Sequence, residues 1–299
     1  MTDWIIALEG TDQGRQIAVF LALLAALAHA LFGAIQKTRF GPWTTRAGID
    51  IAAGTMAAPV ALFVVPWPEP HMWPIFAGMM VIHGGYKYVQ AAAYQRGAYT
   101  VVYPVARGTA PIFAVLAAGV VFGESFTTGQ WAGLAVLLAG IFGLAVYNLV
   151  HITVDRATLL PALGLAVVTG GFIALYTTYD AYGIRATANP FTFLAWFFFL
   201  DNFLMPIIGW SKLRALSAPD RRDLARRAFI GALIAYVSFG SIMLATRIGN
   251  VGEAAVLRET STVFAALIGW MILGESTGPR RIALMTLIAV GAVVVKLAG

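Results

Sequence analysis

One stretch of this chain occurs twice, and the duplication restricts the folds that the chain can adopt. Residues 109–125 (TAPIFAVLAAGVVFGES) align without a gap with residues 260–276 (TSTVFAALIGWMILGES), at a constant offset of 151 residues, and seven of the seventeen pairs are identical. In an apolar chain, such a duplication is typical of transporters built from two structural repeats. Two matched pairs of arginines continue the alignment upstream: Arg96 with Arg247, and Arg107 with Arg258.

The composition predicts that a lipid bilayer surrounds the chain. Hydrophobic residues make up 60% and charged residues 11% of the 299 residues, and the mean hydropathy is +0.79. A soluble domain needs more polar residues than this to cover its surface. The net charge of +6 raises the possibility of nucleic-acid binding, but the basic residues lie in short segments between apolar runs, so we expect no nucleic-acid partner. The absence of cysteine excludes disulfides and thiolate chemistry.

Ten apolar runs have the length of a membrane-spanning helix, because about twenty helical residues cross a hydrocarbon core of about 30 Å. Five runs lie in each half of the chain, and since five is odd, the second half crosses in the opposite direction. We therefore predict an all-α integral membrane protein, a single domain over residues 1–299. Its ten transmembrane helices form two inverted five-helix repeats, about 17–150 and 157–298, around a central cavity. The runs lie near residues 17–36, 47–66, 72–94, 98–122, 129–150, 157–182, 190–211, 227–247, 250–273 and 281–298.

The distribution of lysine and arginine predicts the orientation. Thirteen of these residues fall on one face of the predicted bundle and four on the other, so the first face is expected to be cytoplasmic. Both termini then lie on the outer face of a bacterial inner membrane. The segment 211–227 (SKLRALSAPDRRDLARR) carries six basic residues against two acids, which we interpret as an orientation determinant. The alternative interpretation is a patch for anionic lipid or for regulation.

Three basic residues lie within the apolar runs: Lys87, Arg107 and Arg258. A charge at that depth is costly unless it meets a partner or water. Arg107 lies nine residues into its run and Arg258 eight into its own, so both lie roughly 12–14 Å deep. Two interpretations remain open: the arginines line one central cavity, or each pairs with a carboxylate and locks helices together. The available carboxylates are Asp201, Glu253 and Glu259.

The third run carries a polar stripe. Its members are spaced three or four residues apart, which places them on one helix face. Lipid would not tolerate that face, so we expect it to line a water-accessible cavity, although Lys87 can also extend towards the nearer surface. The next run adds polar residues at four-residue spacing, with Pro104 inside the helix. The stripe consists of His83, Tyr86, Lys87, Gln90 and Tyr94, and the next run adds Tyr99, Tyr103 and Arg107.

The second half has diverged from this stripe. The positions that match His83, Lys87 and Gln90 are Ile234, Ser238 and Ser241. The smaller side chains leave room for an asymmetric ligand, unless the two serines serve helix packing. We add Tyr236, Trp196 and Asp201 as further wall residues. The predicted substrate-binding residues are His83, Tyr86, Lys87, Gln90, Tyr99, Tyr103, Arg107, Trp196, Tyr236, Arg258 and Glu259.

Motifs for catalysis or nucleotide binding do not occur in the sequence. There is no Walker or dinucleotide fingerprint and no HExxH, and the four histidines are scattered. We therefore expect no catalytic residues, no cofactor and no metal. Gly129 and Gly133, at GxxxG spacing, predict a close helix contact instead.

The apolar helix that ends in Gly-Glu before the last helix of each half resembles the EamA group of the drug/metabolite transporter superfamily. Its carriers are VVFGES at 120–125 and MILGES at 271–276, and the resemblance covers essentially the whole chain. It implies export by alternating access from a central cavity. Within the group, the run YPVARGTAPIFAVL at 103–116 and the tyrosine-rich third and fourth runs are most similar to exporters of aromatic amino acids.

The resemblance implies roles for five of the candidate residues. Lys87 or Arg107 would receive the substrate carboxylate, and a carbonyl or Glu259 its ammonium group. Tyr103 or Trp196 would contact the ring. Small multidrug relatives place a glutamate in the first span, but residues 17–36 contain no acid, which argues against exchange of protons for cationic drugs.

Four classes of function follow, in decreasing order. The first is a carrier that exports small metabolites, above all aromatic amino acids, with or without proton coupling. The second is a carrier of the same architecture for a drug or another metabolite, such as a sugar conjugate. A membrane-embedded enzyme would need an oriented catalytic set, for which His83 with Glu259 is the best pair, and a channel would conduct without saturating. We expect neither of these, and we expect the carrier to act as a monomer.

Overall fold

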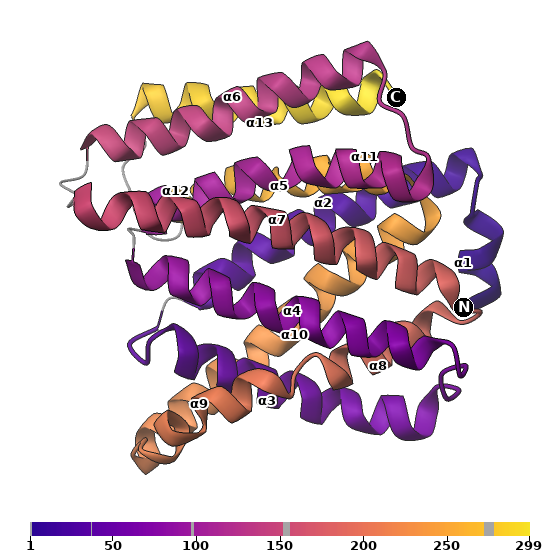
Figure 1. Ribbon diagram of the computed structural model, residues 1–299, viewed down its shortest axis with the longest axis vertical. Coiled ribbons are helices and arrows are strands. Elements are labelled where there is room, and N and C mark those ends of the chain that lie inside the picture. Colours follow the sequence, from indigo (N-terminus) through magenta and orange to yellow (C-terminus); the bar gives the residue numbers. More distant parts are fainter. Residues whose placement is uncertain (1, 37, 97–98, 152–155, 272–277) are drawn as a thin grey trace. The chain divides into compact units, whose positions relative to one another are not determined.

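The computed structural model describes residues 2–36, 38–96, 99–151, 156–271 and 278–299. Over these residues the chain forms α-helices and one π-helical turn, with no strand. The elements are α1 (Thr2–Leu8), α2 (Asp12–Ile35), α3 (Pro42–Pro59), η1 (Val60–Val64), α4 (Met72–Arg96), α5 (Tyr99–Phe122), α6 (Thr128–His151), α7 (Arg156–Ala186), α8 (Pro190–Leu200), α9 (Leu204–Arg214), α10 (Ala218–Ile248), α11 (Val251–Arg258), α12 (Ser261–Met271) and α13 (Pro279–Leu297) (Figure 1).

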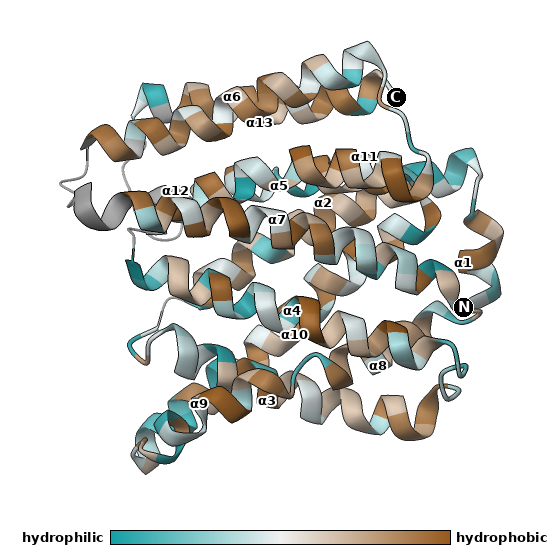
Figure 2. Ribbon diagram, in the orientation of Figure 1, coloured by the Kyte–Doolittle hydropathy of each residue, from teal (hydrophilic) through white to brown (hydrophobic). Residues whose placement is uncertain are grey.

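Each of the ten predicted apolar runs coincides with one helix or with two consecutive elements. Seven stretches of the described chain are long and apolar enough to cross a bilayer, and they contain α2, α3 with η1, α5, α6, α7, α8 with α9, and α10. Of the other three runs, α13 is a shorter apolar helix, the polar stripe lowers the hydropathy of α4, and a break divides α11 from α12 (Figure 2). The prediction of an all-α membrane protein is confirmed.

The chain divides into two compact units, and each unit takes helices from both halves of the sequence. The first unit contains residues 1–84 and 179–248, and the second contains residues 85–178 and 249–299. Two of the boundaries fall inside helices α4 and α7. The residues of one polar stripe on α4 are therefore divided between the units, with His83 in the first and the remainder in the second.

In the first unit, α10 packs along α2 and α3, and α3 also packs against α8 and α9. Small residues allow the helices to approach closely: Ala22, Ala25 and Ala26 of α2 are fully buried. Two side-chain hydroxyls on α10 bond to backbone carbonyls of neighbouring helices. Ser238 donates to the carbonyl of Ala25 at 3.2 Å, and Tyr236 donates to that of Ala53. The Ser238 contact is the packing role that the sequence analysis left open.

In the second unit, α6 and α13 lie side by side (Figure 1). A Cβ atom on Gly133 would lie 2.8 Å from the backbone nitrogen of Val295, and one on Gly129 would lie 2.7 Å from the Cβ of Ala298. These distances leave no room for any side chain. The close helix contact that the GxxxG spacing predicts is confirmed.

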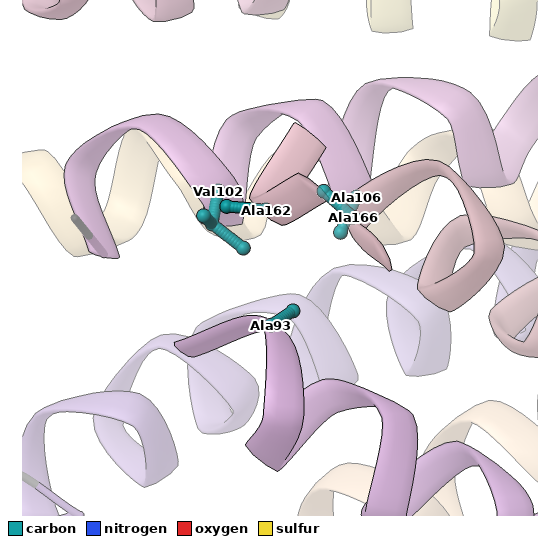
Figure 3. Close-up of a cluster of buried hydrophobic side chains, with 5 residues drawn as sticks. All are labelled: Ala93, Val102, Ala106, Ala162 and Ala166. Atoms are coloured by element: carbon teal, nitrogen blue, oxygen red, sulfur yellow. The ribbon is translucent and has the colours of Figure 1, made fainter. Parts of the chain in front are cut away.

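Small apolar residues also join α4, α5 and α7 within the second unit (Figure 3). All members of this cluster are buried, and all but one are alanines. Such short side chains bring helix backbones close together where lipid offers no hydrophobic driving force between helices. The cluster consists of Ala93, Val102, Ala106, Ala162 and Ala166.

Two of the predicted runs are broken where we expected continuous helices. The run 190–211 is interrupted between Leu200 and Leu204, and the run 250–273 between Arg258 and Ser261. At the second break, the hydroxyl of Thr260 donates to the carbonyl of Leu257 at 2.7 Å and so satisfies a helix-end acceptor locally. Discontinuous membrane helices of this kind are typical of the substrate sites of secondary transporters.

The first Gly-Glu motif ends one helix and starts another. Gly123 has a φ of +68°, a conformation that favours glycine, and it follows the last residue of α5. The carboxylate of Glu124 then accepts hydrogen bonds from the backbone N–H groups of Val251 (2.8 Å) and Gly252 (2.9 Å), at the beginning of α11. The motif is thus part of the scaffold. Its second copy, at 274–276, lies outside the described residues.

Candidate functional site

The predicted site residues of α5 and α11 meet in the second unit. Arg107 and Glu259 form an ion pair, with Nε and Oε2 2.9 Å apart, and the two residues are only 3% and 2% exposed. Glu259 follows directly after the last residue of α11, at the helix break. Pairing offsets part of the cost of placing each charge inside the membrane. Of the two interpretations that the sequence left open, the pairing with a carboxylate is therefore present for Arg107.

The two arginines that the duplication matches lie next to each other. A guanidinium nitrogen of Arg107 (Nη2) donates to the backbone carbonyl of Arg258 at 3.4 Å and to the hydroxyl of Ser261 at 3.1 Å. Arg258 in turn donates to the hydroxyl of Tyr176 at 3.4 Å, and its Cζ lies 5.9 Å from the centroid of that ring. The ring thus offers Arg258 both a hydroxyl acceptor and a π face.

Tyrosines surround this pair of arginines. The rings of Tyr86 and Tyr176 are edge to face with centroids 4.9 Å apart, and Gln90 donates to the hydroxyl of Tyr86 at 2.6 Å. Tyr103 hydrogen-bonds with Ser261. We call this set the arginine cluster; two guanidinium groups and one carboxylate give it a formal charge of +1. It consists of Tyr86, Tyr103, Arg107, Tyr176, Arg258, Glu259 and Ser261.

His83 belongs to a second buried set, in the first unit. Its Nε2 lies 3.0 Å from Oδ2 of Asp180, and its Nδ1 lies 3.6 Å from Oδ1 of Asp201, at the α8–α9 break. The ring also meets Phe197 edge to face, with centroids 5.1 Å apart. We call His83, Asp180 and Asp201 the histidine cluster. In the described part of the chain, no group of three or more His, Cys, Asp or Glu side chains has the arrangement of a metal site.

The histidine cluster shows what the sequence analysis missed. Asp180 was not among the predicted site residues, although a charged residue inside the apolar run 157–182 was a usable signal. The carboxylates that His83 contacts are Asp180 and Asp201, and Glu259 contacts Arg107. The geometry therefore does not support the pair of His83 with Glu259 that we considered for a membrane-embedded enzyme.

The remaining predicted residues have varied surroundings. Trp196 is buried between Trp67 and Trp73, with ring centroids 5.0 and 5.1 Å away. Tyr236 meets Phe198 edge to face at 4.5 Å. Lys87 is buried, at 4% exposure. The side chain of Tyr99 lies outside the described residues, although α5 begins at this position.

The distribution between the units follows directly. The second unit brings together Tyr86, Gln90, Tyr103, Arg107, Arg258 and Glu259 by direct contacts, and Lys87 belongs to the same unit. His83, Trp196 and Tyr236 belong to the first unit.

Comparison with known proteins agrees with this architecture. The model of the EamA-like transporter family matches the chain twice, at residues 16–146 and 160–297, close to the two predicted repeats. A protein of known crystal structure has the same fold with a TM-score of 0.76 and 17% sequence identity, over 96% of this chain and 99% of the other. No curated protein matches the chain at a significant level. Since the family model covers most of the sequence in two repeats, the chain belongs to the EamA-like transporter family, the small-molecule transporters of the drug/metabolite transporter superfamily.

Proposed function

We propose that this protein exports amino acids, with a preference for aromatic ones, by alternating access from a site near the middle of the bilayer. The arginine cluster is the observation that carries the proposal. An aromatic amino acid presents a carboxylate, an ammonium group and a flat ring. The cluster offers two guanidinium groups, the carboxylate of Glu259 and three tyrosine rings, all within one unit.

In this proposal, the substrate divides the ion pair of Arg107 with Glu259. Its carboxylate takes the guanidinium group and its ammonium group takes Glu259, so that one buried ion pair becomes two. No charge is left unpaired in the exchange, which matters because an unpaired charge inside the membrane is costly. Glu259 lies in the break between two helices, where a small change of backbone angles can move it.

The aromatic preference is supported by two features. The rings of Tyr86 and Tyr176 already pack edge to face, an arrangement that a third ring can extend. The run YPVARGTAPIFAVL, which contains Tyr103 and Arg107, resembles that of the aromatic amino acid exporter YddG.

We further propose that His83 carries the proton if export is coupled to one. Histidine is the side chain whose ordinary pKa lies nearest to physiological pH. Asp180 and Asp201, on both sides of the ring, favour its protonated form. His83→Gln is expected to remove the response of export to a pH gradient while uptake without a gradient persists. Loss of both together would contradict a role in coupling.

A proteoliposome uptake panel tests the proposed substrate class. Purified protein is reconstituted, and each of the twenty amino acids is offered with and without a pH gradient. We expect saturable uptake, fastest for phenylalanine, tyrosine and tryptophan, and more than tenfold slower after Arg107→Gln or Glu259→Gln. Arg222→Gln, in an exposed segment, is the control.

Three outcomes would contradict the proposal. Saturable transport of a sugar conjugate or a drug, with no amino acid transported, would support the second class of carrier. Flux that does not saturate would indicate a channel. Equal transport by the wild type and by both cluster variants would remove the arginine cluster from the substrate site.

We also propose a bacterial inner-membrane location with both termini on the outer face. The natural chain has no cysteine, so single cysteines can be placed at will. A membrane-impermeant maleimide is expected to label Gly299→Cys in intact cells and to label Ser217→Cys only after lysis. The reverse pattern would invert the orientation.

A further inference from the structure

A groove on the first unit lies between α3, α9 and the first turns of α10. Its volume is about 540 Å³, which is within the range of small-molecule sites. Most of its lining is apolar. The lining residues used below are Ile51, Thr55, Trp210, Arg214, Arg221 and Phe229.

The side chains at the rim are large, apolar and exposed. Trp210 is 56% exposed, Phe229 51% and Ile51 41%. In a membrane-spanning chain, such side chains meet hydrocarbon. A second hollow of about 710 Å³ shares Ile51, Thr55 and Trp210 with the first and continues along α3 and α9 to Phe203. Together they form one long apolar channel, which we call the α3–α9 groove.

One end of this groove is basic. Arg214, the last residue of α9, and Arg221, in the first turns of α10, line the same end. Arg221 donates to the backbone carbonyls of Arg214 at 2.8 Å and Leu216 at 3.0 Å, which holds its guanidinium group at the mouth. The guanidinium group of Arg214 lies over the ring of Trp210, with its Cζ 6.0 Å from the centroid.

The acids near this end are paired with other cations. Asp220 lies 2.6 Å from a guanidinium nitrogen of Arg39, and Asp223 lies 3.2 Å from Nε of Arg227. The acid that lines the inner hollow, Asp50, is 1% exposed and lies 2.8 Å from Nε of Arg46. The mouth of the groove therefore remains positive.

We propose that the α3–α9 groove binds one anionic phospholipid molecule. An acyl chain occupies the apolar channel, and the phosphate group is held by Arg214 and Arg221, since a guanidinium group matches phosphate geometry with paired donors. The basic segment 211–227 belongs to the face that the arginine count assigns to the cytoplasm, where anionic lipids attract such segments. A soluble anion would use the arginines alone, and an uncharged lipid the channel alone. The two features together select an anionic lipid.

Thermal unfolding and native mass spectrometry of the purified full chain test this site. Phosphatidylglycerol is titrated against phosphatidylcholine with the same acyl chains and against inorganic phosphate. We expect phosphatidylglycerol to raise the Tm and to give a one-to-one complex, because a ligand that binds only the folded state stabilises it. The double variant Arg214→Gln/Arg221→Gln is expected to weaken this binding by roughly tenfold or more, from about 1 kcal/mol per basic residue.

Two further variants separate the site from general surface charge. Arg222→Gln/Arg226→Gln removes the same charge from the same segment but from residues outside the groove lining, and it should bind as the wild type does. Thr55→Phe fills the groove and keeps every charge, so it should weaken binding of the long-chain lipid. It also provides a test if the double arginine variant does not fold.

Several results would overturn the proposal. Equal stabilisation by phosphatidylcholine would remove the phosphate contact, and equal stabilisation by inorganic phosphate would make the site an anion site without a lipid chain. Equal weakening in both double variants would reduce it to non-specific surface charge. Unchanged binding in Thr55→Phe would mean that the groove does not hold the chain.

Discussion

Arg107 and Arg258 occupy matched positions in the two repeats, yet their surroundings differ. Arg107 forms an ion pair with Glu259, whereas Arg258 meets the ring and hydroxyl of Tyr176. The position in the first repeat that matches Glu259 is Gly108, because 259 minus 151 is 108. A Cβ atom on Gly108 would lie 3.1 Å from the side chains of Ile141 and Phe142 on α6. The close contact between α5 and α6 thus leaves no room there for a glutamate.

The backbone differs at the two arginines as well. Arg107 lies inside the continuous helix α5, whereas Arg258 is the last residue of α11. Thr109 and Thr260 also match, but Thr109 donates to carbonyls within a continuous helix and Thr260 donates to Leu257 at a break. Duplication therefore supplied two arginines, while packing decided which copy received the carboxylate and the break.

The largest effect is expected from Glu259→Gln. It leaves the buried guanidinium group of Arg107 without its carboxylate, which typically costs about 3–5 kcal/mol of stability. Thermal unfolding in detergent should show a large fall in Tm. Glu253→Gln is the matched control on the same helix, because the partner of Glu253 is the half-exposed Lys296 at 3.3 Å and such a pair contributes about 1 kcal/mol or less. Similar falls in both variants would contradict the asymmetry.

Gly108→Ala tests the packing side of the comparison. The new methyl group would press on Ile141 and Phe142, so we expect a loss of about 1–3 kcal/mol, measured as the free energy of unfolding in detergent. Gly164→Ala on α7 is the control, since no described atom lies within 4 Å of a Cβ placed there. The control should be neutral or more stable, because alanine favours a helix more than glycine does. A stable Gly108→Ala would mean that α6 does not restrict this position.

Glu124→Gln tests the cap that starts the helix of Arg258. The loss of charge at the α11 N-terminus should cost about 1 kcal/mol. Hydrogen exchange should become faster at the amides of Val251 and Gly252, which donate to the carboxylate, while α6 stays unchanged. Unchanged exchange at these two amides would show that the cap contributes nothing to α11.

The smallest effect is expected from Tyr176→Phe. It removes the hydroxyl that accepts from Arg258 but keeps the ring beneath the guanidinium group, so the loss of stability should stay at about 1 kcal/mol or below. Tyr176→Leu removes both contacts and should lower the Tm further. Equal effects of the two substitutions would mean that the ring does not stabilise Arg258.

Local patterns predicted much of the fold. Helix positions followed from apolar runs of membrane length, and the α6–α13 contact followed from glycines at GxxxG spacing. The breaks after Leu200 and Arg258 were not predicted, because each lies within a run whose hydropathy is continuous. The polar stripe on α4 was visible, but its division between two sets of partners was not, since helical spacing gives a face and not a neighbour.

By itself, the sequence determined that this chain is an all-α membrane protein with two repeats, since both properties are linear patterns along the chain. Only the tertiary structure decided that Arg107 pairs with Glu259, that Asp180 meets His83 and that Glu124 caps α11. The physical reason is that a charge inside a membrane must have a partner, but the identity of that partner depends on which helices pack together. Apolar helix faces look alike in sequence whether they meet lipid or another helix.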